Sequence, residues 1–143
     1  MMREKWEPPL GLNVIIVWLW VVSALNGLYW ILFFGGTLQA SHDPVYLGFE
    51  TAFPAADAWL VITSIICAEG LRRRRSWAVL YGIAAGSALI YLGLMDTLYN
   101  LEHGMYVHLS GEMIAEVATN VTCFAFGPLL MWYVWRHRRW LGA

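Results

Sequence analysis

The chain has 143 residues, of which 59% are hydrophobic and only 13% are charged, and it carries nine tryptophans and a formal net charge of −1. Because soluble domains contain about 25% charged residues, this composition indicates an integral membrane protein. The near-neutral charge gives no basis for binding nucleic acid, and the sequence lacks a Gly-rich phosphate loop and the Cys/His spacings typical of zinc sites.

Four apolar runs follow one another along the chain, and each is longer than the roughly 20 residues needed to cross the hydrocarbon core. They predict an all-α, integral membrane four-helix bundle that forms a single domain over residues 1–143. The helices are expected at residues 12–34, 45–70, 77–100 and 111–135, with Pro54 inside the second. Residues 101–110 are expected to form a loop that is partly helical at its start. The first run is too long for the core of a signal peptide and is taken as a retained helix.

The positive charges lie in only three parts of the sequence. All nine Lys and Arg residues fall in the N-terminal lead, the turn after the second helix and the C-terminal tail: Arg3, Lys5, the arginines at 72–75, Arg136, Arg138 and Arg139. None lies in the loops at 35–44 and 101–110. The positive-inside rule therefore predicts that both termini and the middle turn are cytoplasmic.

The acidic residues are distributed in the opposite way. Seven of the ten fall at mid-membrane or toward the predicted outer side: Asp43, Glu50, Asp57, Asp96, Glu102, Glu112 and Glu116. At a rise of about 1.5 Å per residue, Glu50 and Asp96 lie roughly 6–8 Å inside the outer helix ends, and Asp57 approaches the midplane. A carboxylate at such a depth is costly, so each is a candidate functional residue.

Helical periodicity brings these acids onto shared faces. Glu116 and Asn120 are four residues apart, and Glu50 and Asp57 are seven apart, so each pair lies on one side of its helix. The GIAAG stretch at 82–86 is a small-xxx-small surface that should turn its side of the third helix, with Asp96, toward the bundle. We therefore expect one polar interior in the outer half of the bundle. Its candidate ligand-binding residues are Asn26, Glu50, Asp57, Asp96, Tyr99, His103, Glu116 and Asn120.

No Lys or Arg lies near these acids in the sequence, which leaves three ways to accommodate them. Some carboxyl groups can be protonated, as burial and like-charge crowding favour. Donors such as Asn26, Tyr99 and His103 can satisfy them. Alternatively, a bound cation or cationic ligand can neutralise them. No cofactor and no metal site is predicted, because the histidines nearest the acids belong to the expected loop regions and none lies at mid-membrane.

Two resemblances add to this interpretation. The segments FETAFPAADAWL, LYGIAAGSALIYLGLMDTLYNLEHGMY and GPLLMWYVWR resemble a group of small, uncharacterised prokaryotic four-helix membrane proteins over residues 45–136. This resemblance implies a multi-pass protein of a prokaryotic cytoplasmic membrane, and it does not imply any particular function.

The second resemblance is to the EXPERA group, which includes the emopamil-binding sterol isomerases. It rests on Glu50-Thr51 opening the second helix, on Asp96-x-Leu98-Tyr99-x-x-Glu102-His103 ending the third, and on Asn120 followed by Gly127-Pro128. The resemblance implies a pocket for sterols or cationic amphiphiles between four helices, in which acidic residues move a proton. Glu50, Glu102 and Asn120 would line it, with Asp96 and His103 nearby. Candidate catalytic residues are then Glu50, Asp96 and Glu102.

The leading functional hypothesis is that the bundle binds a hydrophobic or cationic amphiphilic molecule, such as a lipid, a sterol or an isoprenoid, against Asp57, Asp96 and Glu116. An enzymatic version uses one protonated and one ionised carboxyl group as acid and base. A second hypothesis is an accessory subunit that forms a homodimer or joins a larger membrane complex. A third is a small proton- or cation-coupled transporter, which is disfavoured because the first helix carries no Glu.

Overall fold

The computed structural model describes residues 7–37, 43–107 and 110–143, without the side chain at position 112. Arg3 and Lys5 of the predicted inner charges lie outside these residues. The described chain is all-α, and its elements are α1 (Leu12–Phe34), α2 (Pro44–Glu50), α3 (Pro54–Arg72), α4 (Trp77–Glu102), the short 3-10 helix η1 (Met105–Val107) and α5 (Gly111–Arg136). The fold class predicted from the sequence is confirmed.

The second membrane span is broken, which corrects the prediction of one continuous helix over 45–70. α2 ends at Glu50, three residues turn without helical structure, and α3 begins at Pro54. Proline is accommodated at the first helical position because its missing N–H would have no partner there. The Thr51 hydroxyl donates to the Leu47 carbonyl at 2.9 Å and caps the end of α2. The two pieces still form one apolar span, Pro44–Arg72.

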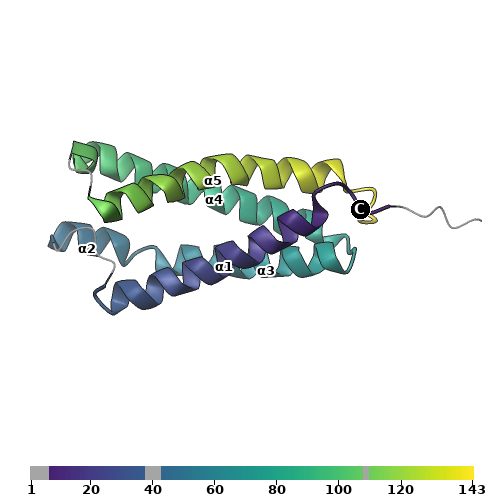
Figure 1. Ribbon diagram of the computed structural model, residues 1–143, viewed down its shortest axis with the longest axis horizontal. Coiled ribbons are helices and arrows are strands. Elements are labelled where there is room, and N and C mark those ends of the chain that lie inside the picture. The colour runs from purple at the N-terminus through teal and green to yellow at the C-terminus, as the bar shows by residue number, and fades with distance from the viewer. Residues whose placement is uncertain (1–6, 38–42, 108–109) are drawn as a thin grey trace, which may run out of the picture.

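The described residues contain four spans that are long and apolar enough to cross a membrane. The second is formed by α2 together with α3, and the others by α1, α4 and α5. This indicates a multi-pass integral membrane protein. The helices pack in the order α1 on α3, α3 on α4 and α4 on α5 (Figure 1). α1 and α5 are not among the closely packed pairs. The bundle is therefore a row of packed helices that is incompletely closed between its first and last members.

α4 and α5 approach each other through glycines. A Cβ atom on Gly86 would lie 2.6 Å from the carbonyl oxygen of Gly127, and a Cβ on Gly127 would lie 2.8 Å from that of Gly86. A Cβ atom on Gly82 would lie 2.6 Å from the Val134 side chain. The GIAAG stretch thus turns its small residues toward the bundle, as the sequence predicted, and the two backbones meet at Gly86 and Gly127.

The side chains are packed at both ends of the bundle, and less so between them. The larger buried cluster, which includes Leu19, Leu71 and Leu130, lies toward the end that carries the arginines at 72–75 and Arg136. We call this the arginine end. At the opposite, distal end, Phe33, Tyr46 and Tyr99 form a smaller aromatic cluster that joins α1, α2 and α4. The acidic residues Glu50, Asp57, Asp96 and Glu116 lie between these two clusters.

The glycine crossing gives a first prediction. Gly86→Val is expected to destabilise the protein by about 1–3 kcal/mol, because the new side chain must displace backbone as well as Met131. The measurement is thermal unfolding of the purified protein in detergent. Gly27→Val is the matched control, since a Cβ at Gly27 meets no atom within 4 Å. Equal melting temperatures for the two variants would contradict the assigned role of the crossing.

A second prediction concerns orientation. The C-terminus lies at the arginine end, and the exposed Glu102 lies near the distal end, while the native Cys67 and Cys123 are buried (Figure 1). If the arginine end is cytoplasmic, Ala143→Cys reacts with a membrane-impermeant thiol reagent only after cells are permeabilised. Glu102→Cys then reacts in intact cells. The reverse pattern would show that the bundle is inverted.

Candidate functional site

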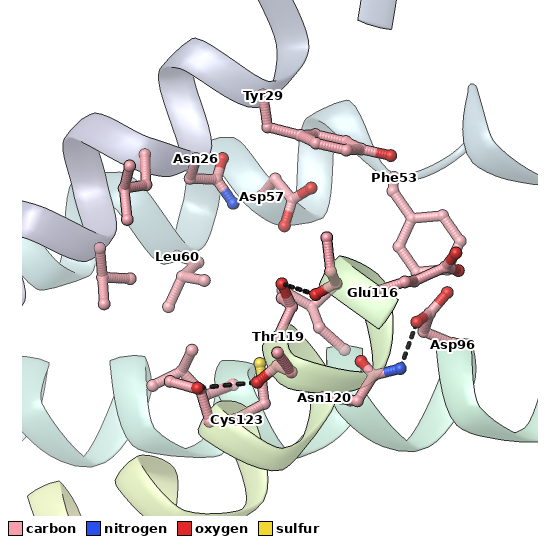
Figure 2. Close-up of a pocket in the computed structure, with 18 of the residues that line it drawn as sticks. Asn26, Tyr29, Phe53, Asp57, Leu60, Asp96, Glu116, Thr119, Asn120 and Cys123 are labelled. Atoms are coloured by element: carbon pink, nitrogen blue, oxygen red, sulfur yellow. Dashed lines mark hydrogen bonds between the residues drawn. The ribbon is translucent and has the colours of Figure 1, made fainter. Parts of the chain in front are cut away.

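A cavity of about 440 Å³ lies in the distal half of the bundle, between the two packed clusters (Figure 2). Every span contributes to its wall. The polar residues that line it are Asn26, Tyr29, Trp30, Tyr46, Glu50, Asp57, Asp96, Glu116, Thr119, Thr122 and Asn120. The sequence predicts that polar side chains converge on one interior. The structure shows this convergence for Asn26, Glu50, Asp57, Asp96, Glu116 and Asn120.

Three of the carboxylates come together at the distal end of this cavity. Glu50 of α2, Asp96 of α4 and Glu116 of α5 each place a carboxylate oxygen within 4.8 Å of the other two. We call these three residues the acidic triad. Glu50 is 6% exposed, and the other two are partly buried. Three carboxylates at this spacing repel one another strongly wherever they are ionised, because little water screens them.

Each member of the triad accepts a hydrogen bond from a neutral donor. The Tyr29 hydroxyl donates to Glu50 at 3.2 Å, and the Asn100 amide donates to Glu116 at 2.9 Å. The Asn120 amide donates to Asp96, as the dashed line in Figure 2 marks. These bonds partly compensate the loss of water around the carboxylates but supply no opposite charge.

Asp57 forms a separate polar position, toward the middle of the second span. It is 9% exposed, and the indole N–H of Trp30 donates to its carboxylate at 2.8 Å. The side-chain amide of Asn26 also hydrogen-bonds this carboxylate and points toward it in Figure 2. Asp57 is thus held by two residues of α1, whereas the triad is held mainly by α4 and α5.

No cation pairs with any of these acids in the part of the chain that the structure describes. The ion pairs found there join Glu69 to Arg72 and Arg73, at the arginine end of the bundle. Four other arginines at that end lie over tryptophan rings: Arg74, Arg75, Arg136 and Arg138. The separation of acids from cations that the sequence indicated is therefore preserved in three dimensions.

The rest of the cavity is apolar, and it is open on one side. Leu60, Leu89 and Leu92 line its floor, and Trp18 of α1 meets Phe126 of α5 edge to face at 5.4 Å beneath it. Distal to that contact, exposed residues of both helices line the cavity: Val21, Leu25, Ala118 and Thr119. The opening therefore lies between α1 and α5, on a face that a membrane-spanning bundle turns toward lipid.

Three of the predicted site residues do not line the cavity. Tyr99 is stacked between Phe49 and His103, with ring centroids 3.8 Å and 4.1 Å apart, and belongs to the aromatic cluster at the distal end. His103 accordingly lies with that cluster and also contacts the Tyr99 carbonyl at 2.9 Å. Glu102 is exposed at the end of α4.

Three residues that hold the acids were not predicted as site residues. Tyr29 and Trp30 of α1 and Asn100 of α4 make the hydrogen bonds described above. A signal for the first two was present, because they follow Asn26 at spacings of three and four and so share its helical face. Asn100 gave a similar signal, because it follows Asp96 by four residues and so lies on the same face of α4.

The hydrogen bond between Asn120 and Asp96 can be tested directly. Asn120→Ala is expected to lower stability by about 1.5–3 kcal/mol, the usual value of a bond to a charged acceptor. Thr119→Ala, one residue earlier, is the control, because the exposed Thr119 hydroxyl bonds only the Ala115 carbonyl of its own helix at 2.9 Å. The measurement is chemical or thermal unfolding in detergent, and equal losses would contradict the assignment.

No family model, no curated protein and no solved structure was found to match this chain. Its function must therefore be inferred from the cavity: an acidic distal end, an apolar floor and an opening between α1 and α5.

Proposed function

We propose that the protein binds a membrane-dissolved amphiphile, such as a lipid, sterol or isoprenoid derivative, with its cationic or polar end against the acidic triad. The observation that carries this proposal is that one cavity of about 440 Å³ combines an apolar floor with carboxylates that have no cationic partner among the described residues. A ligand ammonium group would supply the charge that Tyr29, Asn100 and Asn120 do not. Its hydrocarbon part would cover Leu60, Leu89 and Leu92.

The position of the opening supports a ligand that arrives from the bilayer. The distal end of the bundle is covered by the aromatic cluster of Phe33, Tyr46 and Tyr99, whereas the gap between α1 and α5 is lined by exposed side chains. An apolar molecule in the membrane would meet this gap without passing through water. The acidic triad would then hold the end of the molecule that reaches farthest into the bundle.

The same cavity could support proton transfer of the kind that the EXPERA resemblance implies. Acid–base chemistry needs two carboxyl groups whose surroundings differ, so that one carries a proton and the other does not. Glu50, which accepts from a tyrosine hydroxyl, and Asp96, which accepts from an amide, are the candidates for these roles. Glu102 is not proposed, because it is exposed outside the cavity.

The binding proposal is tested with two photoreactive probes of equal chain length, one a primary amine and the other an alcohol. The amine is expected to label the purified protein saturably and to bind about tenfold more tightly than the alcohol, a difference of about 1.4 kcal/mol. In Glu116→Gln this preference should shrink, because one carboxylate of the triad is lost. Mass spectrometry of lipids that co-purify with the protein would then identify the native ligand.

The opening is tested with bulky substitutions on α1. Leu25 lines the cavity and is 59% exposed, whereas Leu28 on the same helix is 48% exposed and does not line it. Leu25→Trp is expected to reduce labelling, and Leu28→Trp is the matched control. Absence of saturable labelling by either probe would overturn the proposal, and equal binding of the two probes would remove the role of the acids.

A further inference from the structure

The oxygen atoms of the acidic triad have the spacing of a cation-binding site. Carboxylate oxygens of Glu50, Asp96 and Glu116 lie within 4.8 Å of one another. Two oxygens that bind one calcium ion at about 2.4 Å can be at most about 4.8 Å apart. The spacing of the triad is therefore compatible with a calcium-sized cation.

Asn100 supplies an independent observation. Its side chain is 0% exposed, and its Oδ1 atom has no hydrogen-bond partner, while its Nδ2 atom lies 2.9 Å from Glu116 and 3.5 Å from Asp96. A buried amide oxygen without a partner is costly. A half-turn of the carboxamide would place Oδ1 beside both carboxylates, where a cation would bind it, and the cation contact would replace the Nδ2 donation to Glu116 and Asp96.

We propose that Glu50, Asp96, Glu116 and the side-chain oxygen of Asn100 form a binding site for a calcium-like divalent cation. The ligands are all oxygens, which suits a hard cation rather than zinc or copper. This chemistry differs from the histidine-based sites that the sequence analysis set aside, because no histidine takes part.

The charges and the space around the triad fit such an ion. Three carboxylates exceed the charge of one divalent cation, and Tyr29 and Asn120, which would continue to donate to Glu50 and Asp96, are neutral. Calcium takes six to eight oxygen ligands, so water in the adjoining cavity would complete the shell. Asp57 stays outside the site, since Trp30 holds its carboxylate at 2.8 Å.

This inference concerns the same carboxylates as the proposed function but does not depend on it. A divalent cation and a ligand ammonium group would occupy the same position, so each would displace the other. The cation would thereby regulate access of the amphiphile to the triad. The two proposals are tested independently, because cation binding is measured on the full chain without any added amphiphile.

Terbium luminescence is the direct test. Tb³⁺ replaces Ca²⁺ in oxygen sites, and the rings of Tyr29 and Trp30, whose polar atoms contact Glu50 and Asp57, would transfer excitation to it. Saturable luminescence with one site per chain is expected for the protein in detergent. Calcium should displace Tb³⁺ at lower concentration than magnesium does. Glu116→Gln and Asn100→Leu should each weaken binding at least about tenfold.

The control is Glu69→Gln, the same change at an exposed acid of the arginine end, which should leave Tb³⁺ binding unchanged. Glu50→Gln provides a second triad variant on α2, in case Asn100→Leu does not fold. Calcium should also raise the melting temperature of the wild type and of Glu69→Gln but not of Glu116→Gln. Absence of saturable luminescence, or equal affinity in the wild type and both triad variants, would overturn the proposal.

Discussion

The structure depends on how four carboxyl groups are accommodated inside a membrane-spanning bundle in which no basic residue of the described segments pairs with them. Glu50, Asp57, Asp96 and Glu116 share one cavity, and the donors that reach them are hydroxyl, indole and amide groups. Neutral hydrogen bonds offset part of the desolvation of a carboxylate but leave its charge. Both proposed ligands, an ammonium group and a calcium-like cation, would supply positive charge to these carboxylates.

The packing explains why the cavity lies where it does. Small residues allow α4 and α5 to touch near Gly86, and the adjoining apolar cluster fills the arginine end of the bundle. Aromatic rings close the distal end around Tyr46 and Tyr99. Between them, the close packing of α1 is with α3, and the cavity occupies the space between α1 and α5. The polar residues lie in a part of the bundle where tight packing does not fill the interior.

Much of this could be predicted from the sequence, because hydrophobic length and helical period are local properties. The four spans and the inward direction of Asp96, Glu116 and Asn120 follow from run lengths and from spacings of three and four. The glycine face of α4 was recognised for the same reason. These features need no knowledge of which helix lies next to which.

The remaining features depend on neighbours that a single sequence does not reveal. Tyr99 and His103 share a helical face with acids of the site, but Phe49 stacks on Tyr99 and draws both into the distal cluster. The break before Pro54 allows α2 to bring Glu50 to the triad, and it was predicted as continuous helix because apolar length outweighed the proline. Trp30 was missed because tryptophans in a membrane protein are expected at interfaces rather than as donors to a carboxylate.

The glycine crossing also determines which wall of the cavity can adapt. The backbone contact between Gly86 and Gly127, flanked by the side chains of Met131 and Ile90, fixes how closely α4 and α5 approach, and neither glycine lines the cavity itself. α1 has no such contact with α5 beyond the Trp18–Phe126 ring pair. A change in the width of the cavity would therefore come from movement of α1 against α3. Such movement would shift Tyr29 and Trp30 relative to Glu50 and Asp57, the acids of α2 and α3 that they hold.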